Sequence, residues 1–193
     1  MFLITLEDLI PLTEYEIQRE RRFREEIDYL DTYRRVALAP GTTLLFENRR
    51  TLCFRIQEWI RTIGLNDPGS IASELPWFNQ LLPGEGRIQA ALLWNHPSLP
   101  AVLLHAGEKV SAGKFITPAS GFRSAHWIEF AIDEEMESQL SKWEEEVSLE
   151  LVSEQNRLTS QAFSHLMRES LLEDLSGESH ALRHDLNSSV TLA

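Results

Sequence analysis

Three side chains in this sequence are candidates to hold a divalent metal ion together. His126 begins residues 126–132, whose alternation is typical of a strand and places His126 on the apolar face with Ile128. An imidazole in that position can be a metal ligand or a proton carrier if carboxylates reach it. Glu47 and Glu58 are the nearest candidates, and this ligand set suits iron, manganese or zinc. The alternative is a core histidine hydrogen-bonded to the backbone or to a buried carboxylate.

Polar neighbours of the two carboxylates form another possible site. Asn48 follows Glu47 at the end of an expected strand, and Gln57 precedes Glu58 on the next helix. Only one helical run separates the two pairs, so they could converge, and Asn79 is a further candidate. In the alternative, Asn48 starts the helix by accepting backbone N–H groups. Gln57 and Glu58 would then face solvent.

Familiar catalytic motifs are missing from the sequence. It contains no GxGxxG, GxxxxGK[ST], GxSxG or HExxH motif and no EF-hand loop. A single cysteine, Cys53, excludes an internal disulfide framework, a CxxC redox pair and a four-thiolate iron–sulfur site. We therefore assign no catalytic residue and expect a protein that is not an enzyme, with a divalent metal as the one cofactor to consider.

Charge and hydropathy narrow the choice of partners. The 193 residues carry a net charge of −12, and residues 64–193 account for −11 of it, from 8 basic and 19 acidic side chains. This balance argues against nucleic acid and anionic membranes as partners. The amino terminus lacks the basic start of a signal peptide, and no apolar run reaches the ~18 residues of a membrane helix. We expect a cytoplasmic protein with a protein partner or a second copy of itself.

The hydrophobic pattern predicts an α+β fold, with a mostly antiparallel sheet and helices packed on it. Helices are expected over residues 13–33, from 51 to a stop at Gly64, after Asp133, and from about 160 to 177. In the first helix, Ile17, Phe23 and Leu30 should face inward. Strands are expected at 36–39, 42–46, 88–94, 101–104, 114–117, 126–132 and 147–152. Residues 67–86 contain two proline-glycine breaks and are expected to be an ordered loop with a short helical turn at Ile71–Leu75. We expect one domain over 1–175 and a flexible tail over 176–193.

Several segments resemble an uncharacterised bacterial family, number 3501 in the series of domains of unknown function. The similarity lies in residues 6–12, 34–38, 44–49, 55–58, 79–83 and 171–175 and in His126, and it spans about residues 3–175. Family genes often lie beside genes for rubrerythrin-like proteins and cysteine-rich iron–sulfur oxidoreductases. The resemblance thus implies an accessory or binding protein of a bacterial redox, stress or iron-handling system that acts through protein contact.

The sequence also departs from the family pattern at two places. Relatives carry an acidic residue near the strand end that reads Leu93-Trp94-Asn95 here, and an Asp-His-Pro segment where this chain has residues 154–156, Glu-Gln-Asn. Any activity that depends on that second histidine would be lost, with the scaffold kept for partner binding. The alternative function is a metal-dependent enzyme or metal-binding protein that uses His126 and the two carboxylates.

Overall fold

The computed structural model describes residues 3–96, 98–116, 125–154 and 156–176. Sheet A consists of β1 (Arg35–Ala39), β2 (Thr42–Glu47), β3 (Arg87–Leu93), β6 (Lys114–Ile116) and β7 (His126–Ala131), in the order β1-β2-β3-β7-β6. Sheet B consists of β4 (Ala101–Ala106), β5 (Lys109–Ala112), β8 (Val147–Val152) and β9 (Arg157–Thr159), in the order β5-β4-β8-β9. All neighbouring strands are antiparallel. The predicted α+β class is confirmed, with the strands divided between two sheets.

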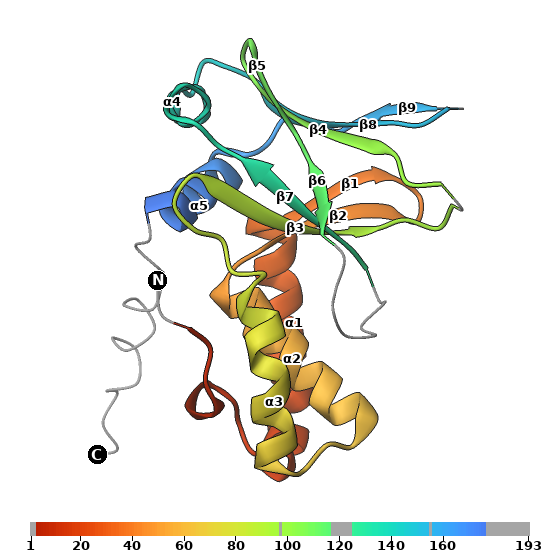
Figure 1. The fold of residues 1–193 in the computed structure, drawn as a ribbon, viewed down its shortest axis with the longest axis vertical. Helices are drawn as coiled ribbons and strands as arrows, with labels where there is room; N and C mark the ends of the chain where they lie inside the picture. Colours follow the sequence, from red (N-terminus) through yellow and green to blue (C-terminus); the bar gives the residue numbers. More distant parts are fainter. Residues whose placement is uncertain (1–2, 97, 117–124, 155, 177–193) are drawn as a thin grey trace.

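The helices occupy two places around these sheets. They are a short 3-10 helix η1 (Leu6–Asp8), then α1 (Leu12–Tyr33), α2 (Arg49–Ile63), α3 (Pro68–Asn79), α4 (Glu134–Ser141) and α5 (His165–Ser176). Figure 1 shows α1, α2 and α3 side by side, extending away from sheet A on the side opposite sheet B. Helices α4 and α5 lie at the edge where the two sheets meet (Figure 1).

Sheet A has a hydrophobic core on each face. Because strand residues alternate between faces, Leu44, Phe46 and Phe130 point into a core that sheet B, α4 and α5 complete. On the opposite face, Ala91 and Trp127 join a second core made with α2, α3 and the amino-terminal segment. Sheet A is therefore the middle layer, and the face on which α2 and α3 pack is called its helix-covered face.

The bounds of the first two long helices match their predictions, although α1 buries only part of the predicted apolar stripe. Helix α2 ends at Gly64, whose φ of 66° is the left-handed conformation that glycine adopts without strain. Helix α1 buries Tyr15, Tyr29 and Leu30, whereas Ile17 is 86% exposed. The inward orientation predicted for Ile17 was wrong because the first turns of α1 face α2 through Tyr15 and Arg19, and Ile17 lies on the opposite side of the helix.

The segment expected to be a loop contains a helix. Asp67 caps α3 by accepting a hydrogen bond from the backbone N–H of Ser70 at 2.7 Å, and Pro68 occupies the first turn, where a missing N–H costs nothing. Pro76 lies inside this helix. The predicted loop with only a short turn at Ile71–Leu75 was wrong because the Pro-Gly pair at residues 68–69 was taken as a break, although proline at a first turn is a start signal.

Most strands of the two sheets were predicted from the sequence. The short strands β5 and β9 were not predicted, whereas the hairpin of β1 and β2 and the strands β3, β4, β6, β7 and β8 were. No helix in the described ranges has the length and apolar character needed to cross a bilayer. Apart from Ser176, which ends α5, the tail predicted for residues 176–193 lies outside the described residues.

Candidate binding groove

A half-open groove of about 460 Å³ lies between α1, α2 and the helix-covered face of sheet A. Its floor is formed by β2 and β3, where Leu45 and Ala91 are cross-strand partners. Ala91 has no side chain beyond Cβ, so the floor stays low beneath the two helices. The groove is about three times as large as the roughly 150 Å³ cavity that holds benzene in an engineered protein.

The walls of the groove are mainly apolar and come from α1, α2 and β3. Phe23 and Leu30 project from α1, Phe54 and Trp59 from α2, and Leu93 from the end of β3. The rings of Phe23 and Phe54 contact each other across the helix pair, with centroids 5.8 Å apart. An apolar surface left open between packed elements, with a few polar groups, is the usual form of a small-molecule site.

The polar group at the outer end of the groove is Glu58. It accepts hydrogen bonds from Arg19 at 2.9 Å through each carboxylate oxygen, from Arg61 at 3.2 Å and from the hydroxyl of Tyr15 at 2.8 Å. Burial raises the pKa of Glu58, but these donors outweigh it and hold the pKa below its ordinary value. Burial, and then the hydrogen bond to Glu58, raise the pKa of Tyr15. Glu58 is therefore an ionised carboxylate with its bonding capacity filled.

At the inner end, near the sheet, lie Thr51 and Arg55. Arg55 donates through Nη2 to Glu47, and its guanidinium lies 5.0 Å from the ring centroid of Trp127. Glu47 is fully buried and also accepts a hydrogen bond from the Thr51 hydroxyl. Arg55 Nε is buried without a hydrogen-bond partner among the described residues. This end of the groove thus carries a neutral ion pair with an unused N–H donor.

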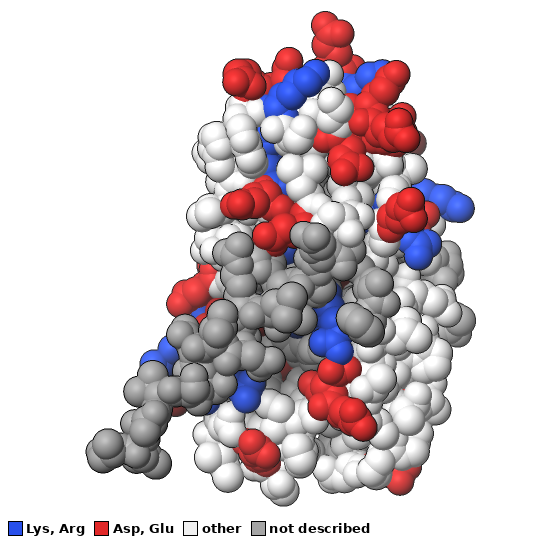
Figure 2. All heavy atoms as spheres, turned by 90° about the vertical axis from the view of Figure 1, so that its left-hand side faces the viewer, with Lys and Arg blue, Asp and Glu red and all other residues white. Residues whose placement is uncertain are grey.

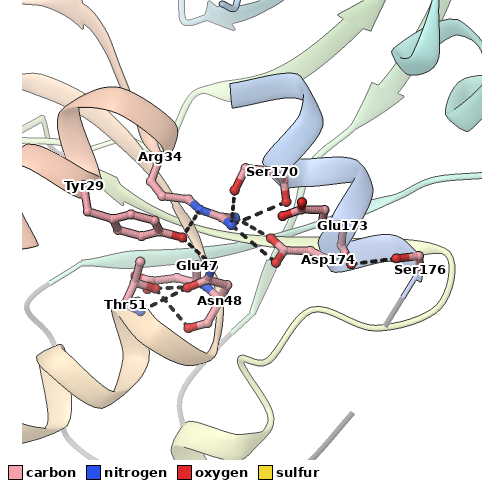
Figure 3. Close-up of polar contacts among 9 residues, drawn as sticks. All are labelled: Tyr29, Arg34, Glu47, Asn48, Thr51, Ser170, Glu173, Asp174 and Ser176. Atoms are coloured by element: carbon pink, nitrogen blue, oxygen red, sulfur yellow. Dashed lines mark hydrogen bonds and ion pairs between the residues drawn. The ribbon is translucent and has the colours of Figure 1, made fainter. Parts of the chain in front are cut away.

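A buried polar network behind Glu47 fixes the start of α2 (Figure 3). Arg34, at the junction of α1 and β1, is fully buried and binds Asp174 and Ser170 of α5 and the Tyr29 hydroxyl. That hydroxyl also accepts a hydrogen bond from the Asn48 amide at 2.8 Å. Because every member contacts another element, the network joins α1, α2 and α5 and keeps the groove's inner end in place.

The three predicted metal ligands do not come together. Glu47 is engaged by Arg55 and Glu58 by Arg19, so each carboxylate already has a cationic partner. His126 is half-buried at the start of β7, where its ring lies edge-on to Phe115, with ring centroids 6.3 Å apart. No hydrogen bond or ion pair joins its imidazole to the side chain of another described residue. Within the described ranges, no group of three or more His, Cys, Asp or Glu side chains has metal-binding geometry. The metal role stays a prediction that this geometry does not favour.

The three predicted amide side chains have structural contacts. Asn48 caps α2 by accepting the N–H of Thr51 at 3.0 Å, which is the alternative weighed from the sequence. Gln57 is buried and pairs with both the N–H and the carbonyl of Ile10, at 2.9 and 3.0 Å. Asn79 does the same with Ile4, at 2.7 and 3.0 Å. Gln57 therefore does not face solvent, and the two amides hold the amino-terminal segment against α2 and α3.

A second surface feature lies around α4. Figure 2, which views the molecule from the left-hand side of Figure 1, shows acidic side chains gathered at the top of this face. The exposed glutamates of α4 and its flanking segments, here called the acidic surface, are Glu108, Glu134, Glu135, Glu137, Glu144 and Glu146. Trp143 lies among them and is 45% exposed, with His165 stacked on its ring at 4.9 Å.

Sequence reasoning missed the groove, although two signals pointed to it. Phe54 lies outside the apolar stripe of α2 that Leu52, Ile56 and Ile60 form, so it was an apolar residue without an assigned neighbour. Arg19 of α1 lies on the side of that helix that faces α2, where it pairs with Glu58. An arginine and a glutamate on consecutive helices are a weak signal, because most such residues do face solvent.

The family model described as "Protein of unknown function (DUF3501)" matches residues 3–102, just over half of the 193 residues. The chain belongs to the DUF3501 family. Comparison with curated proteins gave no match. A crystal structure of a protein of unknown function from Burkholderia pseudomallei K96243 is similar in fold, with a TM-score of 0.77 and 18% identity over 90% of this chain and 100% of that one. At this identity the similarity shows the fold alone.

The DUF3501 match contains every residue that lines the groove. The lining begins at Phe23 and ends at Leu93, and the matched region runs from residue 3 to residue 102. The acidic surface lies outside it, since its first member is Glu108. The groove therefore belongs to the part of this chain that the family describes.

Proposed function

We propose that this DUF3501 protein works by binding and that its groove takes an apolar ligand. The observation that carries the proposal is the groove itself, a half-open space of about 460 Å³ with largely apolar walls. The ionisable residues in its lining are Arg55 and Glu58, and each is held in an ion pair. Groups engaged in this way orient a ligand more readily than they transfer its protons.

The size of the groove sets the size of the ligand. Scaling from the six carbons of benzene in roughly 150 Å³ gives room for about 18 non-hydrogen atoms. Burial of the ligand would cover Phe54, Trp59 and Leu93, and each buried CH₂ of a ligand contributes about 0.8 kcal/mol. A neutral apolar molecule of this size should therefore bind with measurable affinity.

The neutral fluorophore N-phenyl-1-naphthylamine tests this proposal. We expect saturable binding of one molecule per chain, seen as an increase in its fluorescence. Leu93→Glu places a charge in the groove at a position that is 49% exposed, so the fold tolerates it and binding should fall at least tenfold. Leu99→Glu is the matched control, because Leu99 is 48% exposed and lies outside the groove. Equal binding by the two variants would reject the groove as the site.

The acidic surface supports a second candidate function, contact with a partner protein. Aromatic residues are enriched at protein interfaces, and complementary charge steers association. Trp143 supplies a large exposed aromatic ring, and the glutamates around it would attract a basic partner. By the family resemblance, such a partner would belong to a redox, stress or iron-handling system, and this chain would be its accessory protein.

Site-specific crosslinking tests the protein-contact candidate. A photoreactive amino acid at position 143 should capture a partner in cells, and the same residue at Ile17, exposed on distant α1, should not. The captured protein, purified and titrated against the chain, should bind more weakly at high salt. Equal capture from both positions, or binding independent of salt, would contradict contact through the acidic surface.

A further inference from the structure

Arg55 lines the groove and carries a hydrogen-bond donor that has no acceptor. Its one hydrogen bond to a described residue runs from Nη2 to the fully buried carboxylate of Glu47. The Nε atom is buried, and no described residue accepts a hydrogen bond from it. A buried N–H without an acceptor is rare in folded proteins, because it has lost its hydration without a replacement. The Nε–H of Arg55 is thus a donor that a bound molecule can satisfy.

The oxygen atoms next to this donor are already engaged. Glu47 accepts hydrogen bonds from Arg55 and from the Thr51 hydroxyl, one at each carboxylate oxygen. That hydroxyl in turn accepts the backbone N–H of Asn48 at 2.9 Å. The unmatched group at the inner end of the groove is therefore a donor, and the ligand group that complements it is an acceptor oxygen.

The charges around the groove argue against a carboxylate as that acceptor. Arg55 is neutralised by Glu47, so an added anion at the inner end would lose its hydration without gaining a free cation. At the outer end, Glu58 is itself ionised and lines the groove, and Arg19 faces two acids, Glu58 and Glu16. Neither arginine is free to hold an anion, so a neutral oxygen is the acceptor that fits.

The apolar part of a ligand has its place along α2. From Arg55 the lining continues to Thr62, and seven residues of helix at 1.5 Å per residue span about 10 Å. Three aromatic rings line the groove, those of Phe23, Phe54 and Trp59. Aromatic side chains pack favourably against flat rings, either stacked or edge-on. The groove thus combines one polar position near the sheet with aromatic walls.

We infer that the ligand of the groove carries a neutral carbonyl oxygen, which accepts the Nε–H of Arg55, and a flat apolar body that extends along α2 towards Thr62. The inference rests on the proposed function and adds the polar group and the orientation of the ligand. Hydrogen bonds from a charged donor are stronger than those between neutral groups, and a setting of low dielectric strengthens them further. Arg55 thus selects among apolar molecules of similar size.

Two naphthalene derivatives of the same shape are the probes. In 2-acetylnaphthalene a C=O group stands where 2-isopropenylnaphthalene has C=CH₂, and each is titrated as a competitor of N-phenyl-1-naphthylamine on the full chain. Arg55→Lys keeps a cation for Glu47 but places a methylene at the position of Nε. This variant should bind the ketone at least tenfold more weakly and the alkene with unchanged affinity, which also shows that its groove is intact.

Arg61→Lys is the matched control for this substitution. Arg61 lies on the same helix, donates through its Nε to Glu58 and is not among the residues that line the groove. Replacing it by lysine makes the same chemical change in another ion pair of α2. This control should alter the affinity of neither naphthalene derivative.

The Nε–H resonance of Arg55 gives a second test that needs no substitution. In NMR spectra of isotope-labelled wild-type protein, this resonance is identified by through-bond correlation to the Arg55 side chain. Saturation with the ketone should move its proton shift downfield, because the N–H gains an acceptor. Saturation with the alkene should leave the proton without an acceptor and produce no downfield shift.

The outcomes separate the inference from the proposed function. If Arg55→Lys changes ketone and alkene binding by the same factor, or if the ketone does not shift the Nε–H resonance, the groove remains an apolar site and the carbonyl inference is overturned. If Arg61→Lys weakens ketone binding as much as Arg55→Lys does, the assignment of the oxygen to Arg55 is overturned. If neither compound displaces the fluorophore, the proposed function fails and the inference fails with it.

Discussion

Removal of Asp174 should destabilise this protein more than most single substitutions. Arg34 is fully buried, and Asp174 is its counter-ion on α5, 140 residues away in the sequence. Among the described residues, Asp174→Ala leaves the guanidinium hydrogen-bonded to the Tyr29 hydroxyl, at 3.0 Å, and to the Ser170 side chain and carbonyl. These are neutral groups, which cannot replace a carboxylate in offsetting the desolvation of a cation.

The expected loss is about 3–5 kcal/mol, the range for a buried ion pair that loses one member. Replacing both members removes the unpaired charge, so Arg34→Met with Asp174→Leu should recover most of the loss or all of it. Glu20→Ala is the control, because it breaks an exposed pair with Arg24 within α1 and should cost below about 0.5 kcal/mol.

Urea denaturation followed by circular dichroism measures all of these variants. The midpoint should fall strongly for Asp174→Ala and return towards the wild-type value in the double variant, with similar slopes throughout. A loss below about 1 kcal/mol for Asp174→Ala, on the scale of exposed pairs, would refute the reasoning that this pair is buried and uncompensated. A double variant as unstable as Asp174→Ala would show that packing, and not charge, holds α5 in place.

Three further predictions concern single contacts. Asn79→Leu removes both hydrogen bonds to Ile4, so it should lower the free energy of unfolding by about 1–2 kcal/mol. Amide exchange should become faster at Ile4 but not at Ile10, which Gln57 holds, and unchanged exchange at Ile4 would contradict this role. Burial raises the pKa of Cys53 to about 11, with Arg49 opposing, and the thiol pKa of the unfolded chain is about 8.5. A thiol reagent at pH 8 should therefore react about 200-fold more slowly with the folded chain than with the unfolded chain, and rapid labelling of the folded chain would argue against this. The pKa of Glu58 is lowered in the folded state, so its ion pairs stabilise the fold at pH values above the unfolded pKa of about 4.3. The difference in unfolding free energy between wild type and Glu58→Gln should therefore shrink as the pH falls below about 4, and a constant difference would contradict the ion-pair role.

The sequence predicted elements wherever one face of a segment is clearly buried. The period of two in β7 and the apolar stripe of α2 are strong because each packs against a large core. The pattern failed for the amino-terminal half of α1, where Tyr15 and Arg19 contact α2 and Ile17 points away, and for α3, where a Pro-Gly pair at residues 68–69 was taken as a break. Hydrophobic periodicity reports the burial of apolar side chains, so it misleads where a helix packs through residues such as Tyr15 and Arg19.

The candidate site was less predictable than the fold. The polar residues predicted from the sequence have structural roles: Asn48 caps α2, and Gln57 and Asn79 hydrogen-bond the amino-terminal segment. The two glutamates are partners in ion pairs. Their chemistry was compatible with metal binding, but the distances between them depend on how α2 crosses sheet A. The groove depends on unfilled space between α1, α2 and β3, such as that left by the small side chain of Ala91, and local patterning does not show such space.

Amide NMR spectra of isotope-labelled protein titrated with decan-1-ol test the central claim most directly. If the groove binds apolar ligands, the shifts will concentrate on its lining in α1, α2, β2 and β3, with saturable changes at Leu45, Thr51 and Ala91 and little change at Val110 or Trp143. Shifts gathered instead around Trp143, or the absence of saturable shifts at the groove residues, would contradict the assignment of this groove as the binding site.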